Sequence, residues 1–318
     1  MIDLRRLRVL RAVAYYGTVT AAAESLHFTP SAASQQIRQL GRDLGVALLE
    51  PQGRGVRLTP AAHNLLAHAD EIESRWQQAE AELRRQGDEP TGRLRISGFP
   101  TVMSALIAPA AAALRDRHPA LEIRLREADP AECFDLLFSG EADLAVIEAF
   151  SDTPEATDRR FDQQPLMDDP LDLLVPEEHR FAGRRRIRLS EAATEPWITG
   201  WLGTSCRDEV MAACTAAGFT PTIVQEAQEW HVVAALVAKG FGIALVPRLA
   251  QLPPDLPIVQ IPTIGRPAPC RQLLTSTRRG GRDAAAVGAA VRELERVAES
   301  LAESSRQPSD TRQPTDFG

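Results

Sequence analysis

Polar side chains suited to reading DNA recur at helical spacing between residues 29 and 40. At 100° per residue, one side of a helix there would carry Ser31, Ser34, Gln35 and Arg38. Hydroxyl and amide groups bind base edges and phosphate oxygens, and a guanidinium adds charge-assisted contacts to guanine or phosphate. This stripe indicates a helix that contacts double-stranded DNA. The alternative is a solvated face of an amphipathic helix, which has a similar composition.

The residues around the stripe predict the helix that carries it. Thr29 can cap the first turn, and Pro30 suits the first helical position because its missing N–H would have no partner there. Ala33, Ile37 and Leu40 fall on the side opposite the polar stripe. The segment 20–28 before it reads as a supporting helix and turn. One face is therefore expected to pack while the other stays free.

The segment 48–59 predicts a β-hairpin wing next to this helix. Gly53 and Gly55 flank Arg54, and Arg57 follows in an alternating strand pattern. A glycine turn tipped with arginine can follow a phosphate backbone or enter a narrow minor groove. The alternative is an exposed hairpin whose arginines only keep it in solution.

Charge is divided unevenly along the chain. Residues 1–60 contain eight arginines and four acids, a balance of +4, whereas the whole chain of 318 residues carries −7 at pH 7. The basic end is therefore the expected DNA end, because phosphate neutralisation supplies much of the affinity for DNA. With a further amphipathic helix at residues 4–13, residues 1–60 are predicted to form a winged helix-turn-helix.

A long apolar seam follows in residues 61–92, which we interpret as a linker helix and hinge. Apolar residues step by three and four over about three heptads. A helix over residues 60–86 would be roughly 40 Å long. It is expected to pair with a second chain, giving two recognition helices for two half-sites; packing on its own domain would give the same seam. The expected pairing residues are Leu65, Ala69, Ile72, Trp76 and Leu83.

From residue 93 the pattern alternates strand and helix, which predicts an α/β fold with parallel β-α-β units. The theme repeats after residue 161, so residues 93–303 are divided into two lobes. The first lobe comprises 93–162 and 269–303, and the second comprises 163–268. Ligands of such folds sit between the lobes, at the carboxyl ends of strands. Residues 304–318 are polar, contain two prolines and are expected to be a disordered tail.

The order of these parts resembles that of the LysR-type transcriptional regulators over nearly the whole chain. The resemblance is carried by FTPSAASQQIRQL, GVRLT, SGFPT, HPALEIRL with GEADLAV, and KGFGIALVP. It implies a winged helix-turn-helix, a linker helix that pairs two subunits, and a two-lobed domain like periplasmic binding proteins that senses a small-molecule effector. It also implies a dimer or a dimer of dimers.

The resemblance carries site residues over by position. Pro30, Ser31, Ser34 and Gln35 would touch DNA, with Arg54 at the wing. The positions expected to contact the effector are Pro100, Thr101, Asp129, Glu148, Thr204, Ser205 and Gln228.

The chemistry of the effector stays open at the level of sequence. Trp197, Trp201 and Trp230 fall near the expected cleft and could cover an aromatic effector, although tryptophan is mostly core material. Arg207 could pair with an anionic effector, or form a surface ion pair instead. Glu148 would favour a cationic or hydroxylated ligand.

Cysteine usage leaves one alternative function. The four cysteines show no CxxC pair and no metal spacing, so neither a metal site nor a cofactor is expected. Peroxide-sensing members of the LysR family carry two cysteines in the region that matches SCRDEVMAAC. Cys206 and Cys214 lie there, with Ser205 at the position that matches the first cysteine. About 12 Å of helix would separate the two thiols, so a disulfide would require unwinding.

Other classes of protein have little support. The chain shows no GxSxG, phosphate loop, metal triad or nucleophile with an evident base, so it is not expected to be an enzyme. A solute-binding or enzymatic two-lobed domain fused to a DNA-binding head is the alternative from another class. No signal peptide or membrane span is evident, so a cytoplasmic protein is expected.

Overall fold

The N-terminal domain is a winged helix-turn-helix, as predicted. The computed structural model describes residues 3–52, 55–83, 89–149, 153–265 and 268–306. A left-handed residue, His27 with φ 56°, makes the tight turn between the second and third helices. The elements of the domain are α1 (Leu4–Tyr16), α2 (Val19–Ser25), α3 (Pro30–Leu44), β1 (Leu49–Gln52) and β2 (Gly55–Leu58).

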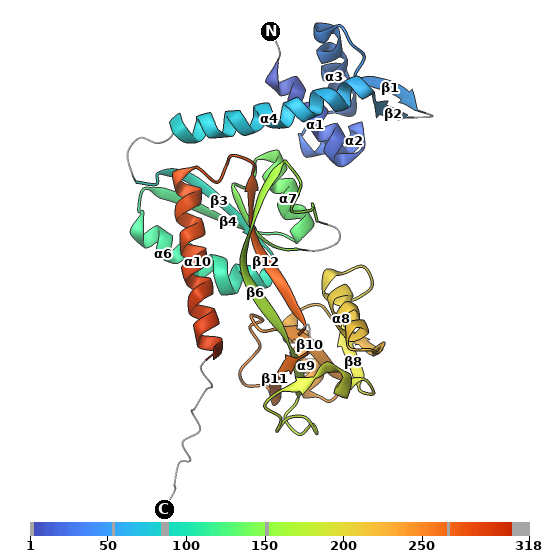
Figure 1. Cartoon of the computed structure of the whole chain (residues 1–318), viewed down its shortest axis with the longest axis vertical. Coiled ribbons are helices and arrows are strands. Elements are labelled where there is room, and N and C mark those ends of the chain that lie inside the picture. Colours follow the sequence, from blue (N-terminus) through green and yellow to red (C-terminus); the bar gives the residue numbers. More distant parts are fainter. Residues whose placement is uncertain (1–2, 53–54, 84–88, 150–152, 266–267, 307–318) are drawn as a thin grey trace, which may run out of the picture.

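A single long helix, α4 (Pro60–Leu83), leads out of this domain and crosses above the rest of the chain (Figure 1). The described part of this helix runs to Leu83, and its predicted end at residue 86 lies outside the described residues. Its first half packs against the N-terminal domain, where Ala62 and Ala69 are fully buried. Its second half extends sideways over the first lobe.

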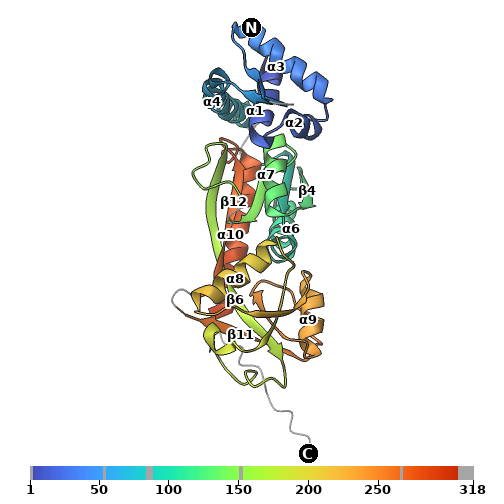
Figure 2. The same ribbon diagram turned by 90° about the vertical axis from the view of Figure 1, so that its right-hand side faces the viewer.

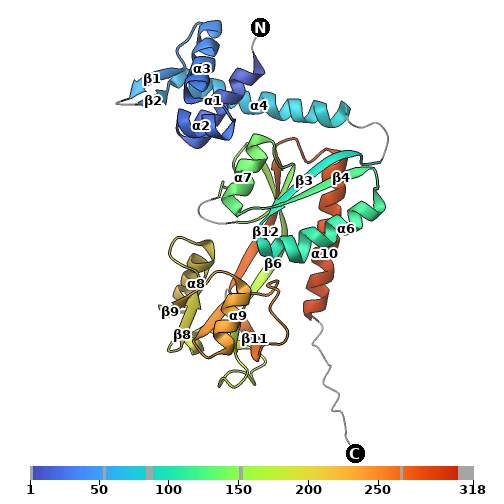
Figure 3. The ribbon, with the colours of Figure 1, turned by 180° about the vertical axis from the view of Figure 1, so that it is seen from behind.

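The first lobe is a sheet covered by helices on both faces. Its strands are β3 (Gly92–Gly98), β4 (Leu121–Glu127), β5 (Leu144–Glu148), β6 (Phe161–Pro176) and β12 (Cys270–Arg278). Their order in the sheet is β4-β3-β5-β12-β6, and the first three run parallel. The covering helices are α6 (Ala108–Arg117), α7 (Pro130–Ser139) and α10 (Ala285–Arg306), seen from opposite sides in Figures 1 and 3. The last helix includes Ser304–Arg306, so the first three residues assigned to a disordered tail are helical.

The second lobe repeats the arrangement at the far end of the molecule (Figure 2). Its strands are β7 (Ile187–Arg188), β8 (Pro196–Thr199), β9 (Thr222–Glu226), β10 (Ile243–Pro247) and β11 (Ile258–Ile264). Its helices are a 3₁₀ turn (Leu189–Ala192), α8 (Ser205–Ala216) and α9 (Trp230–Ala238).

Two long strands, β6 and β12, join the lobes. The first half of β6 pairs with β12, and from Leu171 onward β6 pairs with β10 and β11. The change of partner therefore occurs inside β6 near Pro170, whereas the sequence pattern predicted the boundary between the lobes at residues 162 and 163.

The helical segment that follows β3 is interrupted next to an expected effector position. A short α5 (Pro100–Val102) leads into a π-helical turn (Met103–Ile107) and then into α6. The wider turn precedes Pro109, which lacks the N–H that a regular helix would use. The periodicity of the apolar residues did not reveal this local widening.

Candidate nucleic-acid interface and interlobe site

The third helix presents its polar stripe away from the core. Thr29 Oγ1 accepts a hydrogen bond from the Ala32 amide at 3.2 Å, and Pro30 begins the helix. Ala33, Ile37 and Leu40 are fully buried in the N-terminal domain. Ser31, Gln35 and Arg38 are exposed with Thr29 and Pro30, and Ser34 is half-buried at the edge of the stripe. The geometry therefore leaves one face of α3 free to meet a ligand.

The two strands of the wing pair in register from Leu49 with Leu58 to Gln52 with Gly55. Arg57 on β2 donates to the carboxylate of Glu50 on β1 at 2.5 Å, and both side chains are substantially exposed. Such a surface ion pair contributes only about 0–1 kcal/mol, so a phosphate can replace Glu50 at little cost. Arg54 lies outside the described residues.

The seam of α4 divides into a buried and an exposed part. Ala69 is fully buried by its own chain, and Leu65 is half-buried against the N-terminal domain. Ala69 therefore cannot contact a second chain. Ile72 and Trp76 keep 38% and 49% of their surface exposed, next to Leu4 on α1. The side chain of Leu83 is outside the described part of the chain.

The expected effector positions lie at the ends of several strands and helices. Thr101 is buried and its Oγ1 accepts a hydrogen bond from the indole N–H of Trp230 in the other lobe at 3.1 Å. Pro100, one residue earlier, is exposed. Near Trp230, Gln228 has a buried Oε1 with no hydrogen-bond partner among the described residues. The structure therefore brings Thr101 to the junction of the lobes beside the segment of Gln228.

Other expected effector residues have structural roles. Thr204 caps α8 by accepting from the Arg207 amide at 3.4 Å, and its hydroxyl donates to the Trp201 carbonyl at 2.8 Å. Ser205 is the first residue of that helix. Asp129 stands at the cap position of α7 without a cap hydrogen bond from its side chain.

The tryptophan and arginine hypotheses are partly corrected. Trp197 is fully buried in the core of the second lobe and donates to the Ala192 carbonyl, so it cannot line the cleft. Trp201 is half exposed, and only Trp230 of the three bridges the lobes in the described structure. Arg207 pairs with Glu226 and donates to the Gly200 carbonyl, as the surface ion-pair alternative predicted.

Glu148 belongs to a buried charge cluster that the sequence pattern did not predict. Arg271 donates from Nη1 to Glu148 at 3.1 Å and from Nε to Asp169 at 2.9 Å. Its guanidinium lies 5.1 Å from the ring centroid of Phe99. Glu209, reaching in from α8 of the second lobe, shares a hydrogen bond with Glu148. Three carboxyl groups thus surround one guanidinium where β6 and β12 join the lobes.

One bound proton reduces the excess negative charge of this cluster. Burial and, to a lesser extent, the neighbouring Glu148 raise the pKa of Glu209 to about 8, although Arg271 opposes the shift. Burial also raises the pKa of Glu148 and of Asp169. A hydrogen bond between two carboxyl groups needs one of them protonated, so Glu209 is the group that holds the proton at neutral pH.

The stability of the chain is therefore expected to depend on Glu209. Its pKa is higher in the folded chain than in the unfolded one, so the folded state binds the extra proton and stability falls as pH rises from about 5 to 8. Glu209→Gln should flatten this fall, which we expect to be on the order of a few kcal/mol. Urea unfolding of both proteins across that pH range checks it, with the exposed Glu299→Gln as control. Parallel curves for wild type and Glu209→Gln would contradict the assignment.

All four thiols are held in environments that disfavour the thiolate. Burial raises the pKa of Cys206 and of Cys214 to about 12, and that of Cys133 and Cys270 to about 11. Cys206 lies close enough to Glu209 for the negative charge of that carboxyl to add to the shift. A reactive cysteine normally has a lowered pKa.

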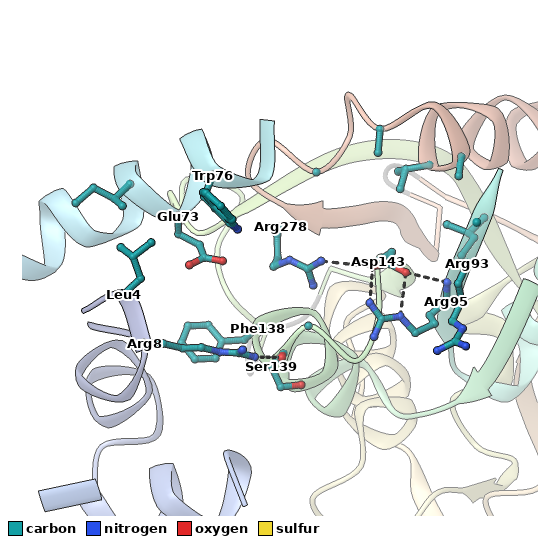
Figure 4. Close-up of a pocket in the computed structure, with 18 of the residues that line it drawn as sticks. Leu4, Arg8, Glu73, Trp76, Arg93, Arg95, Phe138, Ser139, Asp143 and Arg278 are labelled. Carbon is teal, nitrogen blue, oxygen red and sulfur yellow. Dashed lines mark hydrogen bonds and ion pairs between the residues drawn. The ribbon is translucent and has the colours of Figure 1, made fainter. Parts of the chain in front are cut away.

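A cavity of about 920 Å³ opens between the N-terminal domain and the first lobe (Figure 4). Arg8, Glu73 and Trp76 line it on one side. On the other side Arg95 makes a two-pronged ion pair with Asp143, and Arg278 donates to the Leu137 and Ala142 carbonyls. The cavity separates α1 and α4 from the sheet of the first lobe.

Neither a metal site nor a membrane span is found in the described part of the chain. No three His, Cys, Asp or Glu side chains there are grouped so as to hold a metal ion. None of the helices in the same ranges is long and apolar enough to cross a membrane.

Comparison with protein families gives two matches that together span most of the chain. A model described as bacterial regulatory helix-turn-helix protein, lysR family, matches residues 4–63. A model described as LysR substrate binding domain matches residues 87–299. Residues 64–86, which include most of α4, lie between the two matches.

Individual relatives agree with these matches. The chain is 30% identical over 275 residues to the DNA-binding transcriptional dual regulator OxyR of Escherichia coli, covering 86% of this chain and 88% of that protein. It is also 30% identical over 246 residues to the RuBisCO operon transcriptional regulator of Allochromatium vinosum, covering 77% and 79%. A full-length OxyR variant of Pseudomonas aeruginosa has a similar fold, with a TM-score of 0.63 at 22% identity over 92% of this chain and 95% of that one.

Proposed function

The chain belongs to the LysR family of bacterial transcriptional regulators, and we propose on that basis that it reads its operator through the polar face of α3. As a LysR regulator it binds DNA, responds to a small-molecule effector and self-associates. Regulation rather than catalysis is the proposed activity, carried out in the cytoplasm where bacterial DNA lies.

The observation that carries the proposal is the division of α3 into two faces. Ala33, Ile37 and Leu40 anchor the helix completely, so its opposite face cannot turn inward. Gln35 and Arg38 are exposed on that opposite face, with Ser34 beside them. An amide and a guanidinium at this spacing can contact neighbouring base pairs in the major groove. The wing, with Arg54 and Arg57, is assigned to the phosphate backbone.

Removing two of these side chains should abolish specific recognition. Ser34→Ala with Gln35→Ala is expected to weaken binding to the operator by about a hundredfold, since each good base contact contributes roughly 1–3 kcal/mol of discrimination. Fluorescence anisotropy with DNA from upstream of the protein's own gene measures this at fixed salt. Gln36→Ala is the matched control, because Gln36 is exposed on α3 but points away from the polar face. An unchanged affinity in the double variant would overturn the assignment of α3.

The effector is proposed to bind at the junction of the lobes, near Thr101 and Gln228. Thr101 contacts the second lobe through Trp230, and the expected position Glu148 contacts it through Glu209. The unpaired Oε1 of Gln228 offers a buried acceptor to a ligand with a donor group. A ligand that touches both lobes can bind one lobe angle better than another, which is the requirement for an effector.

Redox sensing is the second candidate function. It is favoured by relatives such as the hydrogen peroxide-inducible genes activator of Pectobacterium carotovorum, 30% identical over 249 residues. In this chain, however, Cys206 and Cys214 are both held as thiols with a pKa of about 12. Their environment supports a bound small molecule over thiol oxidation as the signal.

A further inference from the structure

The N-terminal domain docks on the first lobe through an aromatic contact between α1 and α7. The ring of Tyr15 stacks on that of Phe138 with centroids 4.4 Å apart and planes 7° from parallel. The guanidinium of Arg160 lies 4.6 Å from the centroid of Tyr15, and Tyr16 meets Phe138 edge-on. One hydrophobic cluster runs from α1 across this contact into α7. The two domains therefore share a packed core at this point.

Polar contacts fix the same interface. Asp135 on α7 is hydrogen-bonded to the hydroxyls of both Tyr15 and Tyr16, and burial raises the pKa of each tyrosine. Arg8 donates to the Ser139 carbonyl at the end of α7. These contacts all fall on the last two turns of α7, which Figures 1 and 2 place directly beneath α1 and α2.

The opposite end of α7 lies where the lobes meet. The Ala128 amide, just before the helix, donates to the Gly98 carbonyl at 3.1 Å at the end of β3. Gly98 is packed so tightly that a Cβ there would lie 2.5 Å from Ile107 and 2.9 Å from Val102. Val102 belongs to the short helix α5, which also carries Thr101, the hydrogen-bond partner of Trp230 in the second lobe. A shift of Trp230 therefore has a continuous packed route to the first turn of α7.

The helix between these ends is stiff, and the domain beyond it has room to move. Cys133, Phe134 and Leu137 are fully buried, so α7 moves as a body over its length of about 15 Å. Beside the docking contact, the 920 Å³ cavity lies between α1 and the first lobe. A tilt of the N-terminal domain about the contact would change the width of this cavity, whose lining residues on both sides are drawn in Figure 4.

We propose that α7 couples the junction of the lobes to the N-terminal domain, so that a change in the angle between the lobes changes how firmly α1 is held. The proposal rests on the proposed function in one respect, that the effector acts by setting this angle.

The first arm of the test removes the aromatic contact between α1 and α7. In the full-length chain, without DNA or effector, Phe138→Ala is expected to speed amide hydrogen exchange at least tenfold in α1 and the end of α7. Phe241→Ala, which removes an exposed ring in the second lobe, is the control and should leave both helices unchanged. Phe138→Leu keeps the apolar volume but loses the stack, so it serves if the alanine variant does not fold. Unchanged exchange in α1 would show that the contact between Tyr15 and Phe138 does not hold α1 against the first lobe.

The second arm perturbs only the far end. Trp230→Phe removes the hydrogen bond to Thr101 and is expected to speed exchange in α1 severalfold, although it lies in the other lobe. Adding Trp230→Phe to the Phe138 variant should then cause no further change in α1, because the link is already cut. An effect confined to the second lobe and α5, or one that adds fully to that of the Phe138 variant, would overturn the coupling. Because neither DNA nor effector is present, failure here is distinct from failure of the proposed function.

Discussion

Arg271→Met is expected to destabilise the chain by about 3–5 kcal/mol, as measured by urea unfolding at pH 7. The guanidinium is almost completely buried and is ion-paired to Glu148 and Asp169. Methionine fills much of the space but leaves these carboxyl groups, with Glu209, in a place that water barely reaches. Glu148 and Asp169 must then each take up a proton or remain as an unpaired buried charge, and both outcomes cost free energy.

The matched control is Arg93→Met. Arg93 pairs with Glu122 at 3.0 Å, but both side chains are about half exposed, so its loss should cost less than about 1 kcal/mol. Arg271→Met should also be less destabilised at pH 5 than at pH 8, because acid supplies the missing protons. Equal losses in the two variants would show that the buried cluster is not a stabilising element.

Ile72→Asp with Trp76→Asp is expected to convert the chain to a monomer and to weaken operator binding at least a hundredfold. Both side chains are large, apolar and substantially exposed on one side of α4, next to the exposed Leu4. In a dimer that pairs through this side of α4, the two new carboxylates of one subunit would face the same carboxylates of the partner subunit. A monomer loses the gain from binding two half-sites at once, which is typically a factor of about 10²–10⁴.

Light scattering gives the mass, and anisotropy on the full operator gives the affinity. His63→Asp with Ala67→Asp is the control, since it places the same two charges on an exposed side of α4 that turns away from the seam. The control should stay dimeric. If the seam variant also stays dimeric, the subunits pair through another surface.

The recognition helix could be predicted because all its determinants are local. A cap at Thr29, a proline at the first position and a buried residue every three or four positions specify both the helix and its inward face. Nothing distant in the sequence competes with these signals. The prediction of α4 was less complete for the same reason, because periodicity identifies a stripe but not what covers it. Ala69 and Ile72 share that stripe, yet the first faces its own domain and the second faces solvent.

The interlobe charge cluster could not be predicted in this way. Arg271 and Asp169 are separated by 102 positions and meet only because β12 pairs with β6 in one register. Glu209 joins them from the other lobe. The residue types did offer one signal. Arg271 lies beside an apolar strand segment, and Asp168 and Asp169 lie between Pro165 and Pro170 of another strand. Ionisable residues predicted in buried strands need partners, and seeking those partners would have suggested the pairing.

The strand β6 also limits how this molecule can be divided and recombined. Its backbone forms hydrogen bonds in the sheets of both lobes, so a cut or an insertion within β6 would disrupt both sheets. Transplanting one lobe alone would divide β6, so neither lobe would keep the complete strand. The natural exchangeable units are thus the N-terminal domain together with α4 and the two lobes as a pair, and hybrids with other regulators should be joined in the segment after α4.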